Sequence, residues 1–162
     1  MQSIETDPPV LVIGYGNVLR GDDGAGPAAA EALRDQLPER KVEVLAVHQL
    51  LPELVQRLSV SRLAIFIDAD WKIPPGQVHK RTLAAHHSER ETIGHHQSPE
   101  NLLEMTSELY GHAPPAILFT VGGANFGFQE GLSKPVRRAI PELVREVTDA
   151  VKQATDAERH HA

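Results

Sequence analysis

Four short stretches of the chain are apolar at nearly every position and are bounded by glycine, proline or charged residues. They are Val10 to Gly14, Val42 to Val47, Leu63 to Asp68 and Ala116 to Val121. Such runs are typical of strands that are covered on both faces, as in a parallel sheet. A more polar stretch, Gly76 to Ala84, is a candidate edge strand, so we expect about five strands in all.

Helical patterns lie between these strands. An alanine-rich segment, 26–37, carries Pro27 where a first helical turn would accept it. Residues 51–58 predict a short second helix. In the third pattern Ser98 is a candidate N-cap and Gly111 a stop, and Leu102, Met105 and Leu109 lie at helical spacing.

The last helix is expected over 133–154, with a kink or a break at Pro141. Strands that alternate with helices predict a three-layer α/β/α domain with a mostly parallel central sheet. We expect residues 1–162 to form a single domain with its core over 9–152. The polar residues 155–162 are expected to form a flexible tail.

Composition and charge exclude several classes of function. The chain has 162 residues, a net charge of −6 and no cysteine. Without cysteine there is no disulfide, no thiolate-bound zinc and no thiol nucleophile, so any metal must be held by His, Asp or Glu. No basic run suggests binding to nucleic acid, and the apolar runs are too short to span a membrane. We therefore expect a soluble, cytoplasmic protein.

The loop after the first strand, GYGNVL, looks like the start of a dinucleotide-binding loop. Leu19 occupies the position of the third glycine, however, and no Walker loop occurs in the chain. Asp22 and Asp23 stand at the approach to the next helix, where they would repel a phosphate. These features disfavour nucleotide binding.

The two aspartates have two possible roles. Either residue could cap the helix that follows. Alternatively, a carboxylate here would face the crevice at the carboxyl end of the sheet, where α/β proteins bind ligands. Asp68 ends the third strand of the chain, and it could accept hydrogen bonds from loop N–H groups or meet a cation.

Two of the nine histidines, His95 and His96, precede the helix that begins near Ser98. A helix N-terminus disfavours imidazolium, which leaves a neutral ring able to bind metal. This argument does not separate the two histidines. With Asp23 and Asp68, either one would form a site suited to Zn, Ni, Mn or Fe.

These residues resemble those of the NiFe hydrogenase maturation endopeptidases. The family's opening signature, G-x-G-N-x-L-x-x-D-[DE]-x-x-G, is matched from Gly14 to Gly26. The strand that ends in Asp68, the histidine before a helix and the late GLS at 131–133 match further blocks, and their spacing favours His96 over His95. The segment 48–59 is similar to the version in members that serve soluble, NAD-linked hydrogenases.

The resemblance implies an α/β/α endopeptidase, aspartate-type or metal-dependent, that removes a C-terminal extension from the precursor of a hydrogenase large subunit. It implies that nickel in the precursor is bound by Asp23, Asp68 and His96, and that zinc or a similar ion could replace it. Asp23 and Asp68 are then also candidate catalytic proton acceptors. The glycine-rich loop 121–131 is expected to form a wall for the substrate tail.

Several alternatives remain open at this point. A nonenzymatic nickel-binding or nickel-delivery protein could use the same fold. The metal could activate the scissile bond or only position the peptide. The roles of Asp70 and His48 are not assigned, and the oligomeric state is open, with a monomer as the working expectation.

Overall fold

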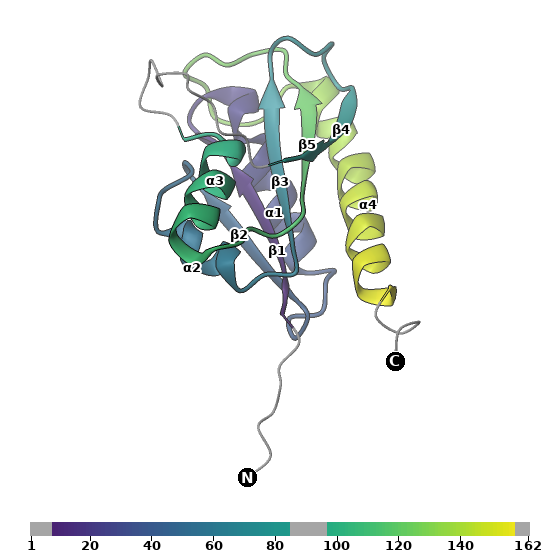
Figure 1. The fold of residues 1–162 in the computed structure, drawn as a ribbon. Coiled ribbons are helices and arrows are strands. Elements are labelled where there is room, and N and C mark those ends of the chain that lie inside the picture. The colour runs from purple at the N-terminus through teal and green to yellow at the C-terminus, as the bar shows by residue number, and fades with distance from the viewer. Residues whose placement is uncertain (1–7, 85–96, 158–162) are drawn as a thin grey trace.

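The computed structural model describes residues 8–84 and 97–157, which form one α/β domain around a five-stranded sheet (Figure 1). The strand order is β2-β1-β3-β5-β4. The strands are β1 (Val10–Tyr15), β2 (Val42–Val47), β3 (Leu63–Asp70), β4 (Val78–Leu83) and β5 (Ala116–Gly122). All five predicted strands are therefore present.

The sheet is mostly parallel, as predicted. β1 pairs with β2 and β3, and β3 pairs with β5, all in parallel. β4 is an edge strand that runs antiparallel to β5. Because most of β4 is exposed, its sequence is polar where the central strands are apolar.

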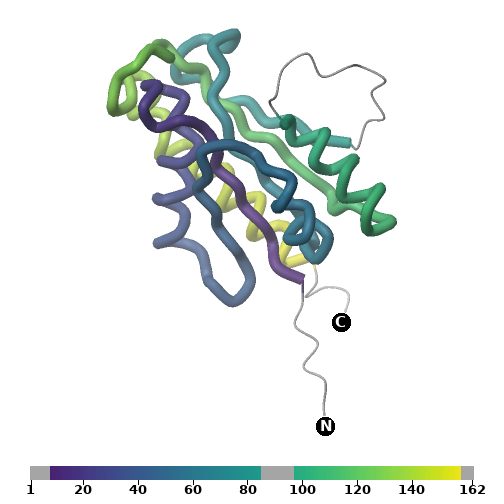
Figure 2. The backbone as a smooth tube through the Cα atoms, turned by 90° about the vertical axis from the view of Figure 1, so that its left-hand side faces the viewer, coloured from purple at the N-terminus to yellow at the C-terminus, as the bar shows by residue number. Residues whose placement is uncertain are grey.

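Helices cover both faces of the sheet, which gives the predicted three layers (Figures 1 and 2). α1 and α4 pack in one hydrophobic core, and α2 and α3 pack in the other. A single 3₁₀ turn, η1, leads into α1. The bounds are η1 (Gly21–Gly24), α1 (Ala25–Arg34), α2 (Leu54–Ser59), α3 (Pro99–Tyr110) and α4 (Lys134–Asp156).

Helix α3 begins and ends at the predicted residues. The Ser98 hydroxyl accepts a hydrogen bond from the Asn101 N–H at 3.1 Å, and Gly111 ends the helix with φ +81°. The predicted apolar face was partly wrong, because Leu109 is 66% exposed. The buried face instead follows Leu102 and adjoining positions, which pack toward α2 and the sheet.

Helix α4 is continuous through Pro141, so the predicted break does not occur. Pro141 lies on the exposed side of the helix, where water can solvate the carbonyl that has lost its partner. The helix also continues to Asp156, into the predicted tail, and residues 158–162 lie outside the described part. No helix in the described ranges is both long and apolar enough to cross a bilayer.

The start of α1 packs unusually closely on the sheet, and Gly26 makes this possible. A Cβ atom at Gly26 would lie 2.5 Å from the backbone oxygens of Ile67 and Tyr15. Gly14 is equally restricted, because its Cβ would collide with the Gly26 backbone. The two glycines therefore set the distance between α1 and the central strands.

We predict that Gly26→Ala lowers the free energy of unfolding by about 1–3 kcal/mol, because backbone must move to admit the methyl group. Urea denaturation monitored by circular dichroism measures this. Gly127→Ala is the matched control, since its nearest neighbour would be the flexible Asn125 side chain at 3.3 Å. Equal stability of the two variants would show that α1 does not depend on the close approach.

Candidate functional site

A cleft of about 540 Å³ lies where the carboxyl ends of the central strands meet. Two of the predicted site residues, Asp23 and Asp68, line this cleft together with His48. The other lining residues are Tyr15, Gly16, Asn17, Arg20, Gln49, Leu50, Arg81, Gln97, Ser98, Pro99, Glu100 and Leu118. The structure thus brings together both predicted carboxylates.

Asp23 is held at the cleft by the turn that follows β1. Its carboxylate accepts a hydrogen bond of 2.6 Å from the Asn17 N–H. Gly16 has φ +147°, and a Cβ there would collide with the Asp23 carbonyl. The glycine therefore lets the loop pass tightly beside Asp23, and the half-buried side chain remains available at the cleft.

Asp22 has a different environment, although it is adjacent in the chain. Its side chain is fully buried and caps neither η1 nor α1. Its carboxylate accepts four hydrogen bonds from the segment after β5: Ala124 N–H at 2.7 Å, Asn125 N–H at 3.0 Å, Ser133 N–H at 2.7 Å and Ser133 O–H at 2.8 Å. Burial alone would raise the pKa of Asp22, but these bonds outweigh burial and lower it. Asp22 is thus a structural anchor for that segment.

The prediction that the loop 121–131 forms a wall of the cleft needs correction. None of the residues 121–131 lines the cleft. The segment instead contacts a residue that lines the cleft, because the Phe126 carbonyl accepts a hydrogen bond from the Arg20 side chain at 3.3 Å. Asp22 ties this loop to η1, and the loop lies beside the cleft without lining it.

Asp68 has a raised pKa, and Tyr15 is its neighbour on β1. Burial is the main cause of the shift, and the charges of Asp23 and Asp70 add to it. Hydrogen bonds from the Ala69 N–H, at 2.8 Å, and from the Tyr15 hydroxyl oppose the shift. The net result is a pKa of about 6 for Asp68. Burial and the Asp68 carboxylate together raise the pKa of Tyr15, so the phenol stays protonated and donates.

Sequence reasoning missed Tyr15 and a second polar pair. Tyr15 is hidden at the end of an apolar run, and the signal that could reveal it is the parallel register, in which Gly14 lies opposite Ile67. The pair is Arg81 of β4 and Glu100 of α3, which form an ion pair of 3.0 Å at the cleft. Arg81 and Glu100 are far apart in the sequence, so no local spacing pattern reveals that they form an ion pair.

The remaining candidates have clear outcomes. Asp70 does not line the cleft, and its carboxylate accepts a hydrogen bond from the Lys72 N–H at 2.8 Å. His48 is an exposed lining residue at the end of β2. His95 and His96 lie outside the described residues, and within that description no three His, Asp or Glu side chains are grouped to hold a metal ion.

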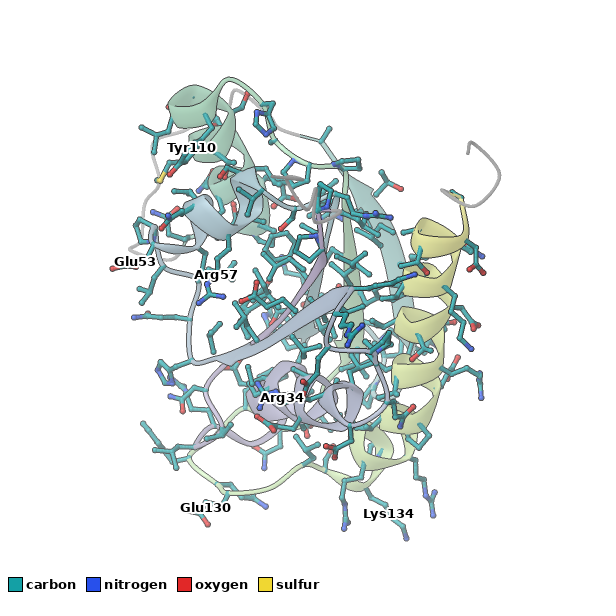
Figure 3. The ribbon with its side chains drawn as sticks, turned by 90° about the horizontal axis from the view of Figure 1, so that it is seen from below. Arg34, Glu53, Arg57, Tyr110, Glu130 and Lys134 are labelled. Carbon is teal, nitrogen blue, oxygen red and sulfur yellow. The ribbon has the colours of Figure 1, made fainter. Side chains whose placement is uncertain are left out.

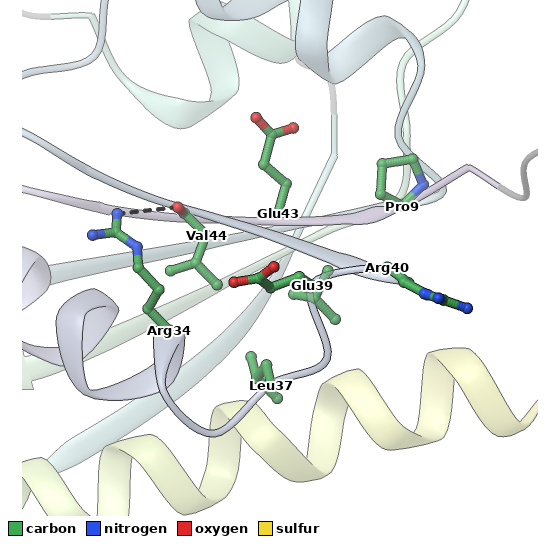
Figure 4. Close-up of a pocket in the computed structure, with 8 residues that line it drawn as sticks. Pro9, Arg34, Leu37, Glu39, Arg40, Glu43 and Val44 are labelled. Carbon is green, nitrogen blue, oxygen red and sulfur yellow. Dashed lines mark hydrogen bonds between the residues drawn. The ribbon is translucent and has the colours of Figure 1, made fainter.

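A second cavity, of about 520 Å³, lies at the other end of β2 (Figure 4). It is lined by Pro9, Arg34, Leu37, Glu39, Arg40, Val42, Glu43 and Val44. The Arg34 guanidinium donates a hydrogen bond to the Val44 carbonyl at 3.3 Å and so covers part of the free strand edge. None of the predicted site residues lies in this cavity.

We predict that the carboxyl of Asp68 titrates near pH 6 and that Tyr15→Phe raises its pKa further, because the variant lacks the hydroxyl that stabilises the charged form. Carbon-13 NMR of the aspartate carboxyl groups against pH measures both values. Tyr110→Phe, an exposed tyrosine at the end of α3, is the control. An Asp68 pKa near 4 in the wild type, or no change in Tyr15→Phe, would contradict this description.

Comparison with known proteins gives three findings. No model of a known protein family matches the chain. The hydrogenase expression/formation protein HupD of Thiocapsa roseopersicina is 36% identical over 75 residues, which are 45% of this chain and 34% of HupD. The match thus spans about a third of the length of that curated relative.

Solved structures are similar over most of the chain. The hydrogenase maturating endopeptidase HybD from Escherichia coli aligns with a TM-score of 0.76 and 25% identity over 90% of this chain and 93% of HybD. The [NiFe] hydrogenase maturation protease HycI from Thermococcus kodakarensis shares the fold, with a TM-score of 0.71 and 20% identity over 90% and 93% of the two chains. The signature around Asp23, the strand ending in Asp68 and these likenesses agree: this chain is similar to the NiFe hydrogenase maturation proteases in its motifs and its fold.

Proposed function

We propose that this protein is an endopeptidase that removes the C-terminal extension of the nickel-loaded large-subunit precursor of a NiFe hydrogenase. The observation that supports this most strongly is the pair of carboxylates, Asp23 and Asp68, in one cleft at the carboxyl end of the sheet. The pair occurs in a chain whose fold matches an endopeptidase of hydrogenase maturation over nearly its whole length.

The electrostatics of the cleft suit a cation. The raised pKa of Asp68 shows that a buried carboxyl group beside other carboxylates carries its negative charge at a free-energy cost. A divalent ion close to Asp68 would reduce that cost. Asp22 is not available for this role, because its oxygens are already occupied by four hydrogen bonds.

We assign the nickel to the substrate. Asp23, Asp68 and His96 are the proposed protein ligands, and zinc or a similar divalent ion could replace nickel on them. Thiolates would have to come from the precursor, since this chain has no cysteine. In this proposal the protein cleaves the precursor only after nickel has been inserted into it.

The residues of the cleft can position the peptide and move a proton. Nickel in the bound precursor would polarise a nearby carbonyl or lower the pKa of a water molecule. The pKa of Asp68 is about 6 in the metal-free cleft, and a bound cation would lower it. A carboxylate oxygen of Asp68 or Asp23 that does not coordinate the metal would then be the proton acceptor. The Tyr15 hydroxyl bonded to Asp68 fixes the direction in which the carboxylate presents its other lone pairs.

Incubation with nickel-loaded precursor should shorten its C-terminus, whereas metal-free precursor should stay intact, as measured by mass spectrometry of the intact subunit. Asp23→Asn, Asp68→Asn and His96→Ala should each lower the cleavage rate by about a hundredfold or more, because each removes a ligand to the metal. Asp149→Asn, an exposed aspartate on α4, is the matched control and should cleave normally.

Three outcomes would count against parts of the proposal. Equal cleavage of the nickel-loaded and the metal-free precursor would show that the protein does not recognise nickel. Full activity of Asp23→Asn would remove that residue from the site. Tight nickel binding by the isolated protein without any cleavage would favour the alternative of a nickel-delivery protein.

A further inference from the structure

Large hydrophobic side chains are exposed in an uneven pattern over the described residues. Five of them lie in segments that follow the carboxyl ends of strands: Val18 and Leu19 after β1, Leu51 after β2, Trp71 after β3 and Phe128 after β5. We call these five residues the apolar rim. Because β1, β2, β3 and β5 are parallel, their carboxyl ends share one edge of the sheet, and both the rim and the cleft lie at this edge.

The opposite edge of the sheet lacks such a ring. The other exposed large hydrophobic residues in the described ranges are Val60, Leu109 and Tyr110, which end α2 and α3 just before β3 and β5 begin. In Figure 3 the labelled Tyr110 and Glu130 lie on opposite sides of the molecule. Exposure of the two aromatic rim residues is high, at 87% for Phe128 and 72% for Trp71.

Part of the rim is held in a defined shape. The Leu19 carbonyl accepts a hydrogen bond from the Gln129 N–H at 3.1 Å, which joins the loops after β1 and β5. The Arg20 guanidinium lies 5.1 Å from the centre of the Phe128 ring. Since Asp22 anchors the same loop through its four hydrogen bonds, the two loops are held together while the Leu19 and Phe128 side chains stay exposed. A preformed apolar surface of this kind loses little entropy when it binds.

The rim is continuous with the cleft. Arg20 lines the cleft and contacts Phe128, and Leu50, which lines the cleft, is adjacent to Leu51. Exposed apolar groups that cluster around a site, with polar residues between them, mark a protein-binding surface rather than a small-molecule pocket. The occupant must therefore be large enough to cover the rim while it places a segment in the cleft.

We infer that the apolar rim docks the folded body of the precursor whose C-terminal segment enters the cleft. The inference rests on the proposed function. A peptide alone would fill the cleft and leave the rim exposed, because none of the five rim residues lines the cleft. A folded protein with an extended tail at its surface covers the rim as well and buries the apolar area from water.

The test separates docking from cleavage. Cleavage of nickel-loaded precursor by the wild-type chain tests the proposed function. Docking is measured by biolayer interferometry with the same precursor, with Asp23→Asn as the parent so that bound precursor is not consumed. Phe128→Gln and Trp71→Gln are added singly and together to that parent. Leu109→Gln, 66% exposed on the opposite edge, is the matched control.

We expect each rim substitution to weaken binding by about tenfold and the pair by more, while Leu109→Gln stays within about twofold of the parent. Urea denaturation should show equal stability, because the replaced side chains are exposed. Unchanged affinity in the double rim variant would overturn the inference even if the wild-type chain cleaves, and so would the absence of any complex with the parent. Sedimentation that shows a dimer of the wild type and a monomer of the rim variant would overturn it as well, because the occupant would then be a second copy of this chain.

Discussion

The buried carboxylate of Asp22 is the interaction on which the arrangement of the cleft depends. It accepts four hydrogen bonds from the segment between β5 and α4, and so ties the loop after β1 to a loop about a hundred residues later in the chain. A charged acceptor that is buried and fully bonded favours one arrangement strongly, since each alternative leaves it unpaired. This contact holds the loop whose Phe126 and Phe128 meet Arg20, and so it fixes the part of the apolar rim formed by Leu19 and Phe128.

The aspartates near the cleft have different roles because their environments differ. Hydrogen bonds stabilise the charge of Asp22 and leave it with no capacity for a ligand. Asp68 is buried near other carboxylates and has one side-chain donor, Tyr15, so its charge is poorly compensated within the chain. The negative charge that is poorly compensated in the cleft therefore lies near Asp68 and Asp23. Such a site suits a cation brought by another molecule.

The sequence predicted the architecture well, because buried parallel strands require apolar runs and helices require caps such as Ser98. It also predicted that carboxylates after β1 and β3 would lie at one cleft, because parallel strands place their carboxyl ends together, and the choice of Asp23 over Asp22 came from the family resemblance. It could not predict that Tyr15 bonds Asp68 or that the segment 121–131 is tied to Asp22 and does not line the cleft. Both depend on contacts between distant parts of the chain that leave no periodic pattern. The continuity of α4 through Pro141 depends on which side of the helix faces water, which one residue does not reveal.

Hydrogen exchange in a matched pair of variants tests the division of roles between the two aspartates most directly. In Asp22→Asn the amides of Ala124, Asn125 and Ser133, or peptides that contain them, should exchange about tenfold faster or more, because they lose a charged acceptor. Asp23→Asn should leave these amides protected and release only the Asn17 amide. Loss of protection in the segment after β5 in Asp23→Asn, or full protection there in Asp22→Asn, would contradict the account.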